Sequence, residues 1–288
     1  MPRTEMPRSR RFQKSLVWLA SYPKSGNTWA RIFLGNYLYN RRTPMPINQV
    51  HRLGVTDAAA ECYHAAAKGA FDRADPLLAL KLRGRMLRWV MSNDADINLI
   101  KTHAIKATLF GVEMIPASLS RSAIYILRNP LDMVISYARH FGRTPEEAAG
   151  AIARSDTTIA ASEKSVKQYI GNWSDHVRSW TRVRDFPVLV LRYEDMQADP
   201  HAAFAKVLSH LGVPVDAERL DRAVRFSSFD ELRRQEERDG FAEHANMPDR
   251  FFHTGRSGQW RGVLPDSLVE KIRHDHGAVM RDFGYLDD

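Results

Sequence analysis

The sequence predicts a single α/β domain with a mostly parallel central sheet and helices on both faces. Four short apolar runs, 16–20, 97–100, 123–127 and 187–191, have the length and composition of buried parallel strands. Segments with helical periodicity lie between them, and this alternation favours crossover connections. A chain of 288 residues with 44% hydrophobic side chains can bury one large core.

The first apolar run, 16–20, leads into a loop of small and polar residues, 21–28, and then into a predicted helix. Asn27 or Thr28 is placed to cap that helix. Such a loop directs unpaired backbone N–H groups and the positive end of the helix dipole at one point, and Lys24 lies beside them. We therefore predict an anion site there, best suited to a phosphate.

Residues 22–29, Tyr-Pro-Lys-Ser-Gly-Asn-Thr-Trp, do not match the G-x-x-x-x-G-K-[ST] loop of nucleotide triphosphatases, because the lysine precedes the glycine. The segment resembles the loop with which soluble sulfotransferases bind the 5′-phosphosulfate of 3′-phosphoadenosine 5′-phosphosulfate (PAPS). A simple turn between a strand and a helix is the alternative interpretation. The resemblance implies a P-loop-like phosphosulfate-binding loop with cofactor contacts from Lys24, Ser25, Gly26, Asn27, Thr28 and Trp29.

The second strand runs into Lys101-Thr102-His103, at the sheet edge where open parallel sheets place their ligands. By itself, a histidine there is more often a surface residue or a hydrogen-bonded core residue than a catalyst. The segment resembles the K-x-H element of the same family, which implies that His103 is the general base. The resemblance also implies that Lys101 holds the sulfuryl group and that Lys24 stabilises charge on the leaving oxygens.

The third strand ends in Arg128, and Pro130 and Asp132 suit the first turn of the helix that follows. Arg128 and Ser136 are then spaced to converge on one anion. The pattern R-N-P-x-D-x-x-x-S resembles the 3′-phosphate segment of the sulfotransferases. An arginine after a strand would otherwise be interpreted as a solvated charge.

Two further segments resemble cofactor contacts of this family. The fourth strand precedes a Y-E-D-M segment, in which Tyr193 would contact the adenosine phosphate part of the cofactor. Phe226-Ser227-Ser228-Phe229 resembles a T-S-F element, which implies that Ser227 and Phe229 hold the 3′-phosphate and the adenine. An amphipathic helix is predicted over 166–180, where we interpret the aromatic stripe as core packing and His176 as no ligand.

The C-terminal element, 251–260, resembles the R-K-G-x-x-G-D-W signature of the 3′-phosphate site. Aligned on Gly255, the arginine and lysine of that signature fall on His253 and Thr254. Either Arg256 reaches the phosphate instead, or the backbone N–H groups of Thr254 and Gly255 bind it. The dimerisation segment of the family would fall on 261–270, where Pro-Asp replaces Thr-Val, so the sequence leaves the oligomeric state open.

Charge and cysteine content limit the partners and the compartment. A net charge of +8 suits a polyanionic small ligand, an acidic surface or nucleic acid. No zinc-finger spacing or RNA-binding motif is present, so we predict no nucleic-acid partner. The single cysteine, Cys62, excludes an internal disulfide, and no apolar run is long enough to span a membrane. We predict a cytoplasmic protein with a flexible basic tail, 1–14, and one sulfotransferase domain, 15–288.

The sequence leaves the acceptor open among phenols, alcohols, sugars, lipid head groups and amines. We expect it to be decided by 40–98, 140–165 and 230–250. Within these, 142–162 is predicted to be a mobile helical or loop insertion and 230–250 a flexible covering loop. Aromatic residues in or beside these segments favour an aromatic or apolar small molecule: Trp89, Phe141 and Phe252.

The predicted function is a PAPS-dependent sulfotransferase that moves a sulfuryl group to a hydroxyl or amine by in-line displacement, with PAP (adenosine 3′,5′-bisphosphate) as product and no metal. One alternative is a nucleotide kinase-like phosphotransferase, which would need a triphosphate loop and magnesium ligands. Another is a protein of the same fold that binds PAP, a nucleotide or nucleic acid without transferase activity.

Overall fold

Five parallel strands form the central sheet of this computed structural model, which describes residues 15–244 and 250–286. The predicted tail, 1–14, and residues 245–249 of the expected covering loop lie outside the described residues. The strand order is β2-β3-β1-β6-β9, and every neighbouring pair is parallel. The strands are β1 (Ser15–Ser21), β2 (Val55–Thr56), β3 (Ile97–Thr102), β6 (Ser120–Leu127) and β9 (Val188–Arg192).

The predicted fold class is confirmed, since the four apolar runs become β1, β3, β6 and β9. The two-residue β2 was not foreseen, because it lies in a stretch whose prolines and glycine favour a loop. Two small antiparallel pairs lie outside the main sheet: β4 (Thr108–Leu109) with β5 (Val112–Glu113), and β7 (Thr158–Ile159) with β8 (Gln168–Tyr169).

Alternate side chains of the central strands enter two separate cores, one on each face of the sheet. Trp18 of β1 and Tyr125 of β6 are fully buried on one face. Leu19 and Ile124 are fully buried on the other face. This arrangement accounts for the continuous apolar runs in the sequence, because a strand covered on both faces has no solvent-facing position.

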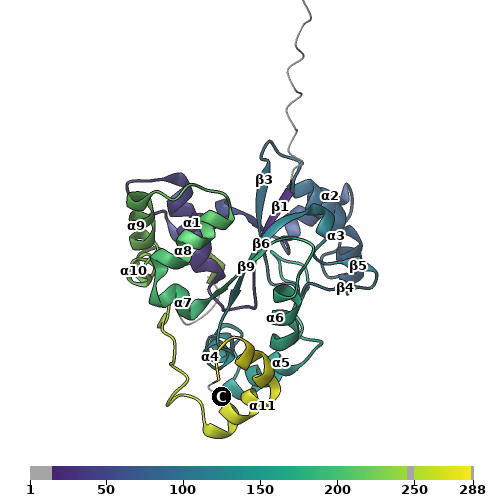
Figure 1. The fold of residues 1–288 in the computed structure, drawn as a ribbon. Helices are drawn as coiled ribbons and strands as arrows, with labels where there is room; N and C mark the ends of the chain where they lie inside the picture. Colours follow the sequence, from purple (N-terminus) through teal and green to yellow (C-terminus); the bar gives the residue numbers. More distant parts are fainter. Residues whose placement is uncertain (1–14, 245–249, 287–288) are drawn as a thin grey trace, which may run out of the picture.

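Helices cover both faces of the sheet, as Figure 1 shows. One face packs against α1 (Asn27–Tyr39), α7 (Tyr193–Ala198), α8 (Pro200–His210) and α9 (Ala217–Phe226), with α10 (Phe229–Asp239) beside them. The other face packs against α2 (Ala60–Ala67), α3 (Pro76–Val90), α4 (Pro130–His140), α5 (Pro145–Ala153), α6 (Trp173–Thr181) and α11 (Asp266–Asp282). Short 3₁₀ helices are η1 (Ile47–Leu53), η2 (Ala117–Leu119) and η3 (Ala242–His244).

Two local predictions are corrected by the structure, and a third is made more specific. The helical or loop insertion expected at 142–162 contains helix α5, which Thr144 and Glu147 begin with a capping box. The expected covering loop begins with helix α10, capped by the side chain of Ser228. The helix expected from residue 166 begins at Trp173, because Gly171 has a positive φ of 66° and Asn172 caps the first turn.

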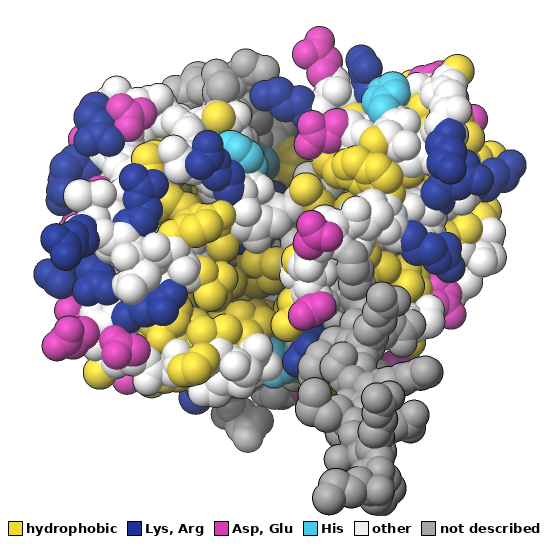
Figure 2. All heavy atoms as spheres, turned by 90° about the horizontal axis from the view of Figure 1, so that it is seen from above, with side chains coloured by type: hydrophobic (Ala, Val, Ile, Leu, Met, Phe, Trp, Pro, Cys, Tyr) yellow, Lys and Arg dark blue, Asp and Glu magenta, His cyan; other side chains and the backbone are white. Residues whose placement is uncertain are grey.

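The surface is hollowed between two lobes in the view of Figure 2, and hydrophobic side chains line the floor of the hollow. Lysine and arginine side chains gather on the lobe at the left, the side on which Figure 1 places α9 and α10. Across 15–244 and 250–286, no helix is both long and apolar enough to cross a bilayer.

Candidate active site

A cavity of about 1060 Å³ lies where β1, β3 and β6 end. Because these three strands are neighbours and parallel, the residues that follow them meet at one edge of the sheet. The cavity is lined by most of the predicted site residues: Lys24, Gly26, Asn27, Thr28, Trp29, Lys101, His103, Arg128, Ser136, Tyr193, Phe229, Thr254 and Gly255. Ser25, Ser227 and Arg256 are not part of its lining.

The loop after β1 is shaped by two residues with positive φ, Lys24 at 68° and Gly26 at 107°. A side chain at position 26 would place a Cβ 2.8 Å from the ring of Tyr193. Gly26 caps α1, and the prediction that Asn27 or Thr28 does so is wrong. The Asn27 side chain instead donates to the backbone oxygen of Leu19, 2.9 Å away. It thereby holds the loop against β1, and the first turn of α1 forms part of the cavity wall.

Two lysines in the cavity wall, Lys24 and Lys101, lie in surroundings that lower their pKa values. Burial, with the neighbouring charges of Arg128 and Lys101, lowers the pKa of Lys24 to about 7. Burial and the charge of Arg31 lower the pKa of Lys101 to about 8. The Lys24 ammonium also lies 3.7 Å from the centre of the Phe251 ring. Crowded cations of this kind are stabilised when an anion binds between them.

Several buried polar atoms in or beside the cavity wall have no hydrogen-bond partner within the part of the chain that the structure describes, among them Asn27 Oδ1 and Arg31 Nε. Two of the donors are the Ser25 hydroxyl and the Nε of Arg128. Buried polar groups in proteins are nearly always paired, so unpaired ones beside a cavity are suited to a ligand. Both residues belong to segments predicted to bind phosphate. The site therefore fits an anionic group with several acceptor oxygens.

His103 presents one ring nitrogen to the cavity as an acceptor. Its Nδ1 lies 2.8 Å from the backbone oxygen of Ser21. Since a carbonyl oxygen only accepts, Nδ1 carries the proton and the Nε2 of the neutral ring is free to accept one. Burial, with the nearby charge of Lys101, lowers the pKa of His103 well below its usual range, so the ring is neutral near pH 7.

Arg128, placed directly after β6, connects three parts of the site. Its guanidinium donates to the backbone oxygens of Lys24, at 3.1 Å, and of Arg256, at 3.4 Å. It also lies 4.3 Å from the centre of the Tyr193 ring. Ser136, two turns into α4, lines the same cavity. Arg128 and Ser136 therefore line one cavity, and their convergence on one anion stays a prediction.

The C-terminal loop is held by groups that the sequence reasoning missed. Asp132 accepts hydrogen bonds from the backbone N–H groups of Gly258, at 2.7 Å, and Trp260, at 3.1 Å. Gln197 accepts from the backbone N–H of Ser257 at 2.9 Å. Asp132 was interpreted as a helix-dipole charge only, and nothing in the sequence singles out Gln197. These bonds fix the loop that carries Thr254 and Gly255.

The sequence left two candidates to replace the arginine and lysine of the family's 3′-phosphate signature, the Arg256 side chain and the backbone of 254–255. The Arg256 side chain is exposed and does not line the cavity. Thr254 and Gly255 do line it. Gly255 has a positive φ of 59°, and a Cβ there would overlap the ring of Phe229. The geometry therefore favours the backbone of 254–255 over the Arg256 side chain.

Ser227, predicted to hold the 3′-phosphate, does not line the cavity, whereas the neighbouring Ser228 does. The Ser227 hydroxyl is fully buried and donates to the backbone oxygen of Ala223 at 2.8 Å, at the end of α9. Ser228 lines the cavity beside Phe229. The chain turns between the two serines as α9 ends and α10 begins, so only the second faces the site.

An ion pair that the sequence reasoning did not anticipate closes another side of the cavity. Arg31, on the buried side of α1, donates two hydrogen bonds to Glu243 of η3, at 2.9 and 2.7 Å. Burial opposes ionisation of Glu243, but the charges of Lys101 and Arg31 outweigh it and lower the pKa of this carboxyl to about 2. The carboxylate thus neutralises part of the positive wall.

The remaining wall mixes apolar and charged groups. Phe141 and Phe252 line the cavity, as predicted, whereas Trp89 is 44% exposed on α3 and takes no part. Further apolar side chains in the wall come from the segments after η1 and α5: Val55, Ala58, Ala59 and Ile159. Charged side chains lie among them: Glu61, Glu163 and Lys164. Among residues 15–244 and 250–286 there is no cluster of three histidine, cysteine or carboxylate side chains that could hold a metal ion.

Comparison with known proteins gives a consistent result. A family model described as "sulfotransferase domain" matches residues 14–284. The mouse protein sulfotransferase 1 family member D1 is 26% identical over 283 residues, covering 92% of this chain and 83% of that protein. Cytosolic sulfotransferase 12 of Arabidopsis thaliana is 27% identical over 272 residues, covering 89% and 74% respectively.

Solved structures share the fold. A mouse sulfotransferase complexed with PAP has a TM-score of 0.59 and 21% identity, over 93% of this chain and 85% of that one. A retinol dehydratase in complex with retinol and PAP has a TM-score of 0.63 and 16% identity, over 94% and 82%.

Proposed function

This chain belongs to the sulfotransferase family, and we propose that it uses PAPS as donor and a hydroxyl or amine of a small molecule as acceptor. The observation that carries the proposal is the meeting of Lys24, Lys101 and Arg128 with the free Nε2 of His103 in one cavity. Cations there suit the donor's phosphates, and the histidine suits the acceptor's proton. PAP is bound in solved structures of the same fold.

The two ends of the donor would be held by different segments. The loop after β1 and the first turn of α1 would hold the 5′-phosphosulfate through Lys24 and the backbone N–H groups. Arg128, Ser136 and the backbone of 254–255 would hold the 3′-phosphate. Support comes from the unpaired Ser25 hydroxyl and Arg128 Nε, one in each segment.

For the reaction, the donor supplies a sulfuryl group on a phosphate leaving group. His103 Nε2 removes the proton of the acceptor hydroxyl as its oxygen bonds to sulfur, and the bond between sulfur and the phosphate oxygen breaks. Lys24 stabilises the negative charge that develops on that oxygen, and Lys101 holds the sulfuryl oxygens. The bond from His103 Nδ1 to Ser21 keeps the imidazole in the tautomer that this step requires.

The acceptor is proposed to carry an aromatic or apolar group, because Phe141, Phe252 and several aliphatic side chains line the cavity. A cytoplasmic location is part of the same proposal. It is supported by the single buried cysteine, which fits a reducing compartment, and by a relative described as cytosolic.

The test combines binding and turnover. Radiolabelled PAPS is offered with a panel of phenols, alcohols, sugars and amines, and PAP binding is measured by calorimetry. We expect label transfer to at least one acceptor class, and His103→Ala should abolish transfer while PAP affinity is nearly kept. PAP binding without transfer to any acceptor would favour a binding protein, and loss of PAP binding in His103→Ala would make that residue structural.

A further inference from the structure

Residues 103–106, directly after β3, are irregular backbone held by side chains of α6. Trp180 donates from Nε1 to the backbone oxygen of Ala104 at 3.0 Å. The Ser179 hydroxyl accepts from the backbone N–H of Lys106 at 3.1 Å. His176 Nε2 lies 3.2 Å from the backbone oxygen of His103. One helix therefore fixes three successive parts of the segment that begins with the proposed base.

The hydrogen bonds of His176 fix which of its two neutral tautomers is present. Its Nε2 faces a carbonyl oxygen, which only accepts, so Nε2 carries a proton. Its Nδ1 lies 2.9 Å from the hydroxyl of Tyr125. Burial lowers the pKa of His176 to about 3, so the ring is neutral, Nδ1 has no proton, and the Tyr125 hydroxyl donates to it.

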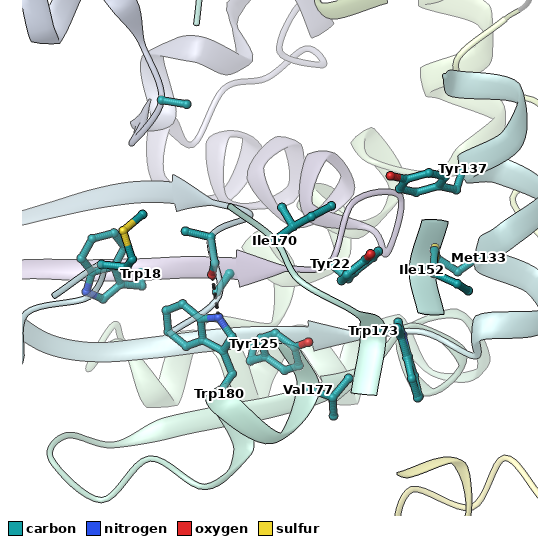
Figure 3. Close-up of a cluster of buried hydrophobic side chains, with 14 of the residues drawn as sticks. Trp18, Tyr22, Tyr125, Met133, Tyr137, Ile152, Ile170, Trp173, Val177 and Trp180 are labelled. Atoms are coloured by element: carbon teal, nitrogen blue, oxygen red, sulfur yellow. Dashed lines mark hydrogen bonds between the residues drawn. The ribbon is translucent and has the colours of Figure 1, made fainter. Parts of the chain in front are cut away.

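This pair lies in the core below the cavity. His176 and Tyr125 are both fully buried, and the Tyr22 ring packs edge-on against the His176 ring with centroids 5.2 Å apart. Figure 3 shows Tyr125 next to Val177 and Trp180 in this core. No part of His176 lines the cavity, so it acts on no substrate directly.

His103 is consequently held from two sides. Its ring is fixed by the backbone oxygen of Ser21, and its own backbone oxygen is fixed by His176. The strand ends at Thr102, so no sheet ladder restrains the peptide group that follows His103. The N–H of this peptide group, from Ala104, donates to the Thr102 hydroxyl at 2.9 Å, and its carbonyl oxygen is held by His176. Without the bond from His176, the carbonyl end would lose that partner, and the backbone that carries the His103 ring could shift.

We propose that His176, supported by Tyr125, is a positioning residue that holds His103 at the geometry needed for proton removal. This inference rests on the proposed function, because it takes His103 as the base. Core packing, the role that the sequence indicated for His176, explains why an aromatic ring is buried there. It does not explain why both ring nitrogens are hydrogen-bonded.

Three variants separate the hydrogen bond from packing. His176→Phe keeps a ring and loses both bonds. His176→Gln places an amide N–H at about the reach of Nε2 and restores the donor to His103, whereas His176→Asn places its amide nearer the Nδ1 position. His276→Phe is the matched control, because His276 is also a buried histidine bonded to a serine, Ser174, at 2.8 Å.

The first readout needs no acceptor. Histidine ring ¹⁵N spectra of the full chain, assigned with His103→Asn, report which nitrogen of His103 carries the proton. We expect a single Nδ1–H tautomer in wild type and His276→Phe, mixed tautomers in His176→Phe, and recovery in His176→Gln but not in His176→Asn. Unchanged His103 signals in a folded His176→Phe would overturn the proposal, whether or not the protein proves to transfer sulfuryl groups.

The second readout is turnover with an acceptor identified in the panel. His176→Phe should lower kcat by about 10- to 100-fold, the scale of a small misplacement of a reacting group, and leave the PAP dissociation constant unchanged. Thermal unfolding of both phenylalanine variants shows the structural cost separately. Equal loss of kcat in His176→Phe and His276→Phe would refute a specific role of His176.

Discussion

Binding of PAP should take up protons above neutral pH, and Lys24 should account for most of them. In the free protein, burial and neighbouring cations lower the pKa of Lys24 to about 7, and burial with the charge of Arg31 lowers that of Lys101 to about 8. A bound phosphate beside these ammonium groups stabilises their charged forms and raises both pKa values. At a pH above the free pKa, binding must therefore draw protons from the buffer.

The size of the effect follows from those two values. At pH 8 a group with a pKa of about 7 is about 10% protonated and one with a pKa of about 8 is half protonated. Full protonation in the complex would then take up about 0.9 proton at Lys24 and about 0.5 at Lys101. Because binding takes up protons, affinity falls as pH rises. The PAP dissociation constant should increase about tenfold from pH 7 to pH 8. This is the product of a factor of about five from Lys24 and a factor of about two from Lys101.

Calorimetry at pH 8 in buffers of different ionisation enthalpy measures this uptake directly. Phosphate monoesters have a second pKa near 6, so PAP itself contributes little at that pH. Lys24→Met should reduce the uptake to the share of Lys101. Lys24→Arg retains a positive charge that does not titrate and should reduce it equally. No uptake by the wild type, or full uptake by Lys24→Met, would refute the assignment of Lys24 to the phosphate site.

Two further predictions concern the 3′-phosphate. Arg128→Met should weaken PAP binding by about 1.5–3 kcal/mol, the range for a hydrogen bond to a charged group, and in calorimetry change the affinity for AMP, which lacks that phosphate, by less. The matched variant Arg256→Met should change neither affinity, and an equal loss of both ligands in Arg128→Met would place Arg128 elsewhere. Asp132→Asn keeps one acceptor oxygen of the two that hold Gly258 and Trp260, so it should lower both PAP affinity and thermal stability, the latter by about 1–3 kcal/mol. Unchanged PAP affinity in a destabilised variant would show that this loop does not contribute to the phosphate site.

The strands and most of the site could be predicted because their signals are local. A strand covered on both faces is a run of apolar residues, and the polar residue after it lies at the ligand edge of the sheet. Arg128 directly follows such a run, and Lys24 and His103 lie within four residues of the end of one. All three line the cavity. Their meeting in space required only that the three strands be neighbours.

Other features could not be predicted because they join distant parts of the chain. The pair of Arg31 and Glu243 links residues 212 positions apart, and the bond between Asp132 and Gly258 spans 126 positions. Nothing near either residue in the sequence indicates its partner. The start of α5 was different, since Thr144 and Glu147 have the spacing of a capping box, a readable signal that we overlooked.

The same positive charges serve two purposes in this cavity. Lys101 is two residues from His103 on β3, and its charge contributes to lowering the pKa of the histidine. A base must be unprotonated to accept a proton, so a cation that holds the sulfuryl oxygens also keeps His103 ready. The cost is repulsion among buried cations, visible in the lowered pKa values of Lys24 and Lys101. Because a bound anion relieves that repulsion, PAP should stabilise the fold most at a pH where both lysines are charged, and a thermal shift that grew above pH 8 would contradict this coupling.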